Sequence, residues 1–175
     1  FLNLGYELFP KVDVGQMEII VRKESGTQLK NTEKTISNME LIIKEELGSD
    51  LSQIVSNIGV FYDLPAAYTP NSGTQDAFIK VQLNEKHKIP TDEYVSILRA
   101  RFLKEFPGVE VSFNTGGLIT AALNEGKMSP IDVQIKGNNL TVLRSLAERM
   151  RDTVNDISAT RDVRILQRID QPTKE

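Results

Sequence analysis

Cysteine is absent from this 175-residue chain, and histidine occurs once, at His87. Without cysteine there are no disulfides and no thiolate metal sites. A single histidine leaves no His pair for a metal, and its polar surroundings predict a solvated loop residue and not a ligand. With no catalytic constellation in view, we expect a binding or mechanical protein without a cofactor, and not an enzyme.

The sequence also lacks long apolar runs and an excess of basic residues. No apolar stretch approaches the roughly 20 residues needed to span a bilayer. A formal charge of −3 and a pI near 5.4 argue against nucleic-acid binding, which needs clustered Lys and Arg. The chain starts abruptly on apolar residues and ends abruptly on Lys174-Glu175, so we expect it to be a piece of a larger protein.

Apolar periodicity organises the first part of the chain. Alternation predicts strands over residues 16–22, 51–58, 76–83 and 109–113. A three-and-four spacing predicts two helices. The first ends at Gly48, and the second starts at Pro90-Thr91 with Thr91 as its cap. Their expected buried stripes are Ile36, Met39, Ile43 and Leu47, and Val95, Leu98, Phe102 and Phe106. The order β-α-β-β-α-β predicts an α+β fold, a ferredoxin-like sandwich over residues 1–114.

A second, shorter unit is predicted after a glycine-containing linker at residues 115–129. Residues 131–136 alternate as a strand, a helix follows from Asn139, and residues 162–168 are expected to close the unit. A lone β-α-β half over residues 130–175 buries too little apolar surface to stand alone. Its complement would come from the first unit, from another copy, or from sequence outside this chain.

A long irregular loop at residues 59–74 concentrates aromatic and apolar side chains. They could fold back on the sheet as a satellite cluster, but a loop of this composition also suits an adaptable apolar contact surface, which we favour. The residues concerned are Phe61, Tyr62, Leu64, Pro65 and Tyr68.

The four methionines are candidate ligands for a soft metal such as Cu(I), which binds thioethers. Met39 and Met150 lie on helical stripes and are expected in the core. Only Met17 and Met128 could then be functional, and two scattered thioethers are too few to predict a metal site.

Two motifs resemble the start of the periplasmic porter region of resistance–nodulation–division (RND) efflux transporters, most closely its C-terminal half. Residues 9–15 fit the family's Phe-Pro-x-x-Asp-x-Gly segment, and residues 26–32 fit its Gly-Thr-x-Leu-x-x-Thr segment. Residues 129–137 resemble the entry to the next porter subdomain. In this family each porter subdomain is a βαββαβ unit, in agreement with the pattern described above.

The resemblance implies a soluble periplasmic part of an inner-membrane protein, attached to the membrane through segments outside this chain. It further implies a homotrimer driven by proton flow, a periplasmic adaptor as partner, and a small-molecule export substrate. Porter subdomains of the family swing to open and close a substrate cleft.

The resemblance also implies roles for individual residues. The loop at Phe61 and Tyr62 matches the family's switch loop, while Glu18, Ile20, Val111 and Phe113 match positions that line the entry cleft. Strand alternation, however, turns Val111 and Phe113 toward the helices, whereas a cleft on the open sheet face would need the opposite orientation. The metal-exporting branch places methionines in its cleft, and residues 118–123 contain none, which favours an organic substrate.

Two other functions fit the sequence less well. A free-standing ferredoxin-like ligand sensor would need a complete second unit. An RNA-binding βαββαβ module would need stacked aromatic residues and basic flanks, which this acidic chain lacks. Apolar spans encoded on either side of the chain would favour the transporter over the sensor.

Overall fold

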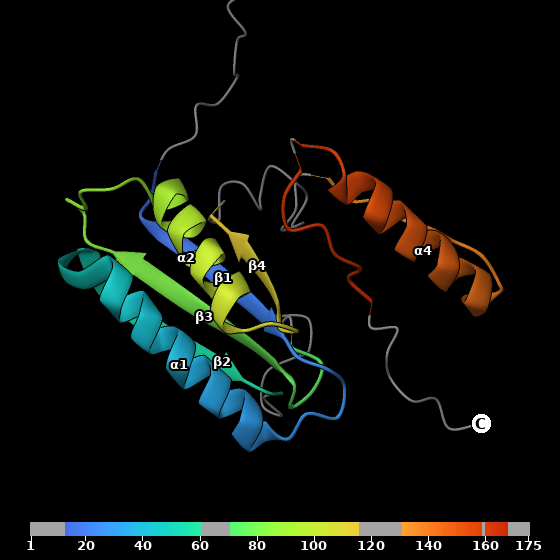
Figure 1. Ribbon diagram of the computed structural model, residues 1–175, viewed down its shortest axis with the longest axis horizontal. Coiled ribbons are helices and arrows are strands. Elements are labelled where there is room, and N and C mark those ends of the chain that lie inside the picture. The colour runs from blue at the N-terminus through green and yellow to red at the C-terminus, as the bar shows by residue number, and fades with distance from the viewer. Residues whose placement is uncertain (1–12, 61–70, 116–130, 159, 168–175) are drawn as a thin grey trace, which may run out of the picture.

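The computed structural model describes residues 13–60, 71–115, 131–158 and 160–167. Its elements follow the chain in the order shown in Figure 1. They are β1 (Gln16–Arg22), α1 (Leu29–Leu47), the short 3-10 helix η1 (Gly48–Asp50), β2 (Leu51–Ile58), β3 (Asp76–Leu83), α2 (Thr91–Glu105), β4 (Glu110–Asn114) and α4 (Leu140–Asn155).

The four strands form one sheet in the order β2-β3-β1-β4, with every neighbouring pair antiparallel. Helices α1 and α2 cover the same face of this sheet (Figure 1). Chain order and sheet order together give the predicted ferredoxin-like α+β sandwich, so this prediction is confirmed. β4 is an edge strand, and one of its sides is therefore open to another part of the chain.

The core lies between the sheet and the two helices. Met17, Ile19 and Val21 of β1 face the helices and are almost fully buried, as their alternation predicted. The two predicted helical stripes are confirmed, except that Phe106 lies just beyond α2 and is only partly buried. Burying each such large apolar side chain stabilises the fold by about 1.5–3 kcal/mol.

The structure confirms the predicted end of α1 but not the predicted cap of α2. Gly48 ends α1 with a φ of 47°, a left-handed conformation that glycine adopts at little steric cost. The predicted cap of α2 is wrong, because Pro90 is the N-cap and Thr91 is the first helical residue. The Thr91 hydroxyl donates to the carboxylate of Asp13, which lies 78 positions earlier in the chain.

His87 is more enclosed than the sequence suggested. Only 15% of its side chain is exposed, its Nδ1 lies 2.8 Å from the Ile89 carbonyl oxygen, and its Nε2 lies 3.9 Å from Asp13 Oδ1. The prediction of a solvated side chain is therefore wrong. The connection before α2 folds back on itself and places the ring against Asp13.

The predicted second unit is realised only as a helix. α4 begins after Asn139, whose Oδ1 accepts a hydrogen bond from the Val142 backbone N–H at 3.1 Å. Residues 131–136 and 162–167 are not strands, so the two strands expected to flank the helix are not formed. Apolar alternation gives a segment one apolar face, but a strand forms only where its backbone finds a pairing partner.

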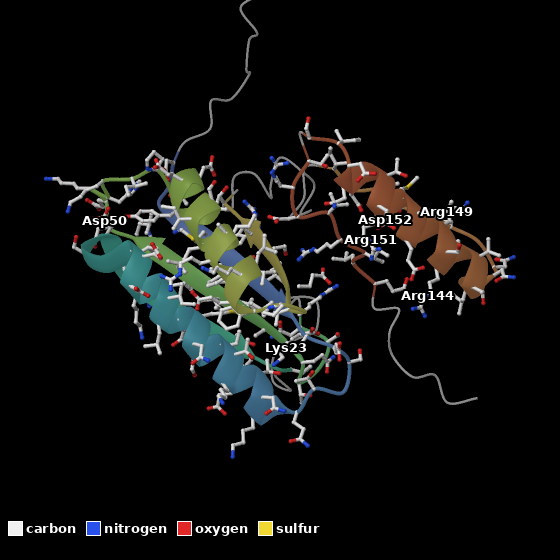
Figure 2. The ribbon with its side chains drawn as sticks, in the orientation of Figure 1. Lys23, Asp50, Arg144, Arg149, Arg151 and Asp152 are labelled. Carbon is white, nitrogen blue, oxygen red and sulfur yellow. The ribbon has the colours of Figure 1, made fainter. Side chains whose placement is uncertain are left out.

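α4 lies beside the sandwich on the β4 side (Figure 1). None of its residues is buried, and 38% of Met150 is exposed, so the prediction of Met150 as a core residue is wrong. Figure 2 labels Arg144, Arg149, Arg151 and Asp152 on this helix. The exposed apolar residues of α4 and of the segment before it are Ile131, Val133, Leu140, Val142, Leu146 and Met150.

Candidate functional site

A cavity of about 280 Å³ lies where α2, β4 and the segment after α4 meet. Its walls combine apolar side chains of the sandwich with polar side chains of the later segment. The lining residues are Arg99, Phe102, Leu103, Val109, Val111, Phe113, Asn155, Thr160, Arg161, Asp162 and Val163. The cavity is thus shared between two parts of the chain that the sequence analysis treated as separate units.

Aromatic rings form one wall of this cavity. Phe102 of α2 and Phe113 of β4 stack with ring centroids 6.2 Å apart and an interplanar angle of 14°. The guanidinium carbon of Arg99 lies 4.9 Å from the centroid of the Phe113 ring, within the range of a cation–π interaction. Phe102 is almost fully buried, so the wall is anchored in the core.

Asp162 supplies the anionic group of the cavity. Its carboxylate accepts two hydrogen bonds from Arg99, at 3.2 Å from Nε and 2.7 Å from Nη2. It also accepts the backbone N–H of Phe113 at 3.0 Å, on the open edge of β4. Asp162 has a φ of 56°, a conformation that is uncommon for residues other than glycine and most tolerated by Asn and Asp.

Beyond Asp162 the chain crosses to the other face of the sheet. Arg164 Nη1 donates to the Ser112 hydroxyl, and Arg22 donates to the carbonyls of Ile165 at 3.1 Å and Leu166 at 3.0 Å. Because Ser112 and Phe113 are adjacent in β4, their side chains lie on opposite faces. Residues 160–166, which we call the strap, therefore wrap around the β4 edge.

The strap brings two arginines close together. Burial, followed by repulsion from Arg22, lowers the pKa of Arg164 from its ordinary value. The Nε of Arg22 is buried and has no hydrogen-bond partner within the described part of the chain. The Arg22 contacts to the strap are thus made by its two terminal nitrogens alone.

The four residues that family resemblance assigns to the entry cleft fall into two pairs, on opposite faces of the sheet. Val111 and Phe113 line the cavity, and both face the helix side of the sheet, as alternation predicted. Glu18 and Ile20 lie on the opposite sheet face and do not line it. A helix-side orientation and a cavity-lining position are compatible here because Val111 and Phe113 of the edge strand β4 are only partly buried.

The five residues assigned to the switch loop, Phe61, Tyr62, Leu64, Pro65 and Tyr68, lie outside the described residues. So do Met128 and residues 118–123. Met17 and Met39 are buried in the core, and Met150 lies on α4 and is not among the residues that line the cavity. Among the residues that the structure describes, no group of three or more His, Asp or Glu side chains could hold a metal ion.

Sequence reasoning missed Arg99 and Asp162, the two residues that set the polarity of the cavity. They are 63 positions apart, and neither belongs to a local motif. The one available signal was weak: Asp162 lies in a segment expected as a strand, where aspartate is unfavourable.

A profile of the AcrB/AcrD/AcrF family matches residues 1–174. The chain belongs to this family, whose members are RND efflux transporters. No curated protein sequence matches the chain. Within the described residues, no helix of this AcrB/AcrD/AcrF-family chain is both long and apolar enough to cross a membrane.

The fold of this family member is similar to that of a heavy metal efflux pump solved in two crystal forms. One form gives a TM-score of 0.70 at 18% identity over 87% of this chain. The other gives 0.72 at 19% identity over 91%. The chain spans only 16% and 17% of the length of those pump chains. At this level of identity the likeness concerns the fold.

Proposed function

We propose that this chain is a periplasmic porter segment of a proton-driven RND efflux transporter and forms part of its substrate cleft and export path. The observation that carries the proposal is the AcrB/AcrD/AcrF family match over residues 1–174, which covers the ferredoxin-like sandwich and the second unit alike. A free-standing ligand sensor would need a complete second unit, whereas residues 131–136 and 162–167 form no strands beside α4. The chain would contribute movement and binding, and no chemistry of its own.

The cavity at β4 is the part of the chain best suited to the substrate path. It lies between the sandwich and the strap, so relative movement of these two parts would change its size. Val111 and Phe113 supply apolar contacts there. Glu18 and Ile20, on the other sheet face, would contact substrate only if the path also runs along that face. The switch-loop role of Phe61, Tyr62, Leu64, Pro65 and Tyr68 remains part of the proposal.

An organic substrate fits the cavity better than a metal ion. Among the residues that the structure describes, the lining carries aromatic and aliphatic side chains and no Met, Cys or His. Soft metals bind thioether, thiolate and imidazole ligands. The similarity to a heavy metal efflux pump favours metal export as the second candidate function. For that function, ligands would have to come from outside the described residues.

The proposed assembly follows the family. The parent protein would be an inner-membrane homotrimer that contacts a periplasmic adaptor, with its membrane segments outside this chain. The exposed apolar residues of α4 support this view, because Leu140, Val142 and Leu146 lack a covering layer within the described structure. The remainder of the parent protein would supply that layer.

Transport by the full-length protein tests the proposal. The protein is expressed in a bacterial strain that lacks its own efflux pumps, and accumulation of fluorescent organic dyes is measured with and without a proton uncoupler. We expect lower accumulation that the uncoupler restores. Tolerance to copper, silver and zinc salts, measured in the same strain, tests the second candidate. Unchanged accumulation of every dye together with a gain in metal tolerance would replace the first candidate by the second.

A further inference from the structure

The Asp162 carboxylate accepts hydrogen bonds from a set of donors whose arrangement suits a carboxylate. The Arg99 guanidinium approaches it with two nitrogens, at 3.2 and 2.7 Å, and the Phe113 backbone N–H adds a third donor at 3.0 Å. Paired Arg–carboxylate hydrogen bonds are among the strongest in proteins and are geometrically selective for planar anions. We call Arg99 and the Phe113 N–H the carboxylate seat.

We infer that the seat binds the carboxylate of an apolar organic ligand, and that Asp162 fills it when no ligand is bound. This inference deepens the proposed function and rests on it, since it names the substrate class of the same cavity. Asp162 then acts as an internal competitor. A ligand carboxylate replaces it on Arg99 and on the Phe113 N–H, and no covalent bond changes.

The surroundings of the seat determine the rest of the ligand. Phe102 and Phe113 offer a stacked aromatic wall, and Val109, Val111 and Val163 extend the apolar lining. A volume of about 280 Å³ is close to the lower limit for small-molecule sites, so a ligand with one aromatic ring fits best.

Charge favours an anion once Asp162 has left. The charged lining residues in the described part of the chain are Arg99, Arg161 and Asp162, which together carry one net positive charge with Asp162 in place. Departure of Asp162 leaves two arginines against an apolar wall, and a ligand carboxylate restores the balance. A cationic ligand would meet both arginines without a counter-charge.

The position of Asp162 in the chain also allows its carboxylate to move away from the carboxylate seat. It lies in the strap, outside any helix or strand, and its left-handed φ of 56° costs more for aspartate than for glycine. Further along the strap, Arg164 and the carbonyls of Ile165 and Leu166 have separate partners in Ser112 and Arg22. Release of Asp162 therefore need not detach the whole strap.

The test measures binding of two matched probes to the purified 175-residue chain by titration calorimetry. The probes are 4-phenylbutyrate and its neutral analogue 4-phenylbutanamide, and the measured quantity is the ratio of amide Kd to carboxylate Kd. We expect a ratio above one for the unmodified chain. Asp162→Asn keeps the shape and tolerates the φ but is a weaker competitor, so the ratio should rise about tenfold.

Arg99→Gln removes the guanidinium and should lower the ratio to about one, while binding of the amide changes little. Amide hydrogen exchange at Phe113 gives a second readout: exchange should accelerate in Asp162→Asn and slow again when 4-phenylbutyrate is added. Ser112, its neighbour in β4, provides the internal control. Unchanged thermal unfolding midpoints establish that both variants are folded.

A ratio that falls or stays constant in Asp162→Asn would overturn the inference, because weakening the competitor on Arg99 should favour the carboxylate probe over the amide. Equal binding of both probes to the unmodified chain would also overturn it. A different measurement tests the proposed function. It fails if cells that express the full-length protein show neither lower dye accumulation nor higher metal tolerance. Each failure can thus be recognised independently.

Discussion

Asp13 and Thr91 join the start of β1 to the start of α2 by a pair of hydrogen bonds. The Asp13 carboxylate accepts the Thr91 backbone N–H at 2.9 Å and the Thr91 hydroxyl at 2.5 Å, and it also accepts the Gly15 N–H at 2.9 Å. A residue that precedes β1 therefore satisfies the first turn of α2, a task usually done by an N-cap side chain. Negative charge at a helix N-terminus is also favourable.

Asp13→Ala should lower the free energy of unfolding by about 1–2 kcal/mol, the usual cost of a lost N-cap side chain. Asp13→Asn keeps one oxygen acceptor and should cost less. Chemical denaturation of the 175-residue chain measures both values. Equal losses in the two variants would mean that Asp13 does not act through its acceptor oxygens.

Asp50 predicts how stability responds to acid. Its carboxylate accepts the Lys88 backbone N–H at 2.6 Å and the Tyr94 hydroxyl at 2.9 Å. The Lys88 hydrogen bond is the largest cause that lowers the pKa of Asp50. Burial, followed by the hydrogen bond to Asp50, raises the pKa of Tyr94. Figure 2 places Asp50 at the end of the sandwich where α1 leads into β2.

Because the folded-state pKa of Asp50 is lowered, its stabilising contribution is fully present above the unfolded pKa of about 3.9 and is lost as the pH falls through the folded-state pKa. Asp50→Asn should therefore destabilise the chain at pH 7, and the difference from the unmodified chain should shrink below about pH 4. Thermal unfolding midpoints across pH 2–7 check this expectation. A difference that stays constant with pH would show that the Asp50 charge is not involved.

Neighbouring residues of α2 test where the core ends. Phe102 is 1% exposed and Leu103 is 70% exposed, although they adjoin in sequence. Phe102→Ala should cost about 3–5 kcal/mol in free energy of unfolding, because it removes one of the two stacked rings and leaves a cavity in the core. Leu103→Ala should stay within about 0.5 kcal/mol. Comparable losses at both positions would contradict the packing of α2.

Two methionines test whether α4 is covered by something outside the described structure. Met39 is fully buried, whereas 38% of Met150 is exposed. In the isolated chain, Met39→Ala should cost about 2–5 kcal/mol and Met150→Ala at most about 0.5 kcal/mol.

In the full-length protein, Met150→Ser should lower the thermal stability of the purified assembly, because the position becomes buried there. Thr153→Ser, an exposed position on the same helix, is the matched control. Identical midpoints for Met150→Ser and the control would mean that α4 remains uncovered in the assembly.

The sequence predicted those parts of the fold that depend on local periodicity. Met17, Ile19 and Val21 alternate toward the helices, and Gly48 ends α1, because both features are encoded within a few residues. Residues 131–136 carry a similar alternation but form no strand, since pairing depends on a partner that alternation does not supply.

The site was harder to predict because its key contacts are non-local. Family resemblance assigns Val111 and Phe113 to the entry cleft, which stays a prediction; in the structure both residues line the cavity at β4. The hydrogen bonds between Arg99 and Asp162 form only because the strap turns around the β4 edge. No sequence motif predicts that turn. His87 was misjudged for the same reason: its enclosure comes from Asp13, which is distant in sequence.

The central claim is that the cavity at β4 belongs to the export path of the full-length transporter. Initial rates of dye efflux from pre-loaded cells test it most directly, with Val111→Trp to fill the cavity and Val55→Trp as the control. Val55 is 49% exposed on β2, at the opposite edge of the sheet. At matched expression, we predict a several-fold lower efflux rate for Val111→Trp and an unchanged rate for Val55→Trp. Unimpaired efflux of every dye by Val111→Trp would contradict the claim.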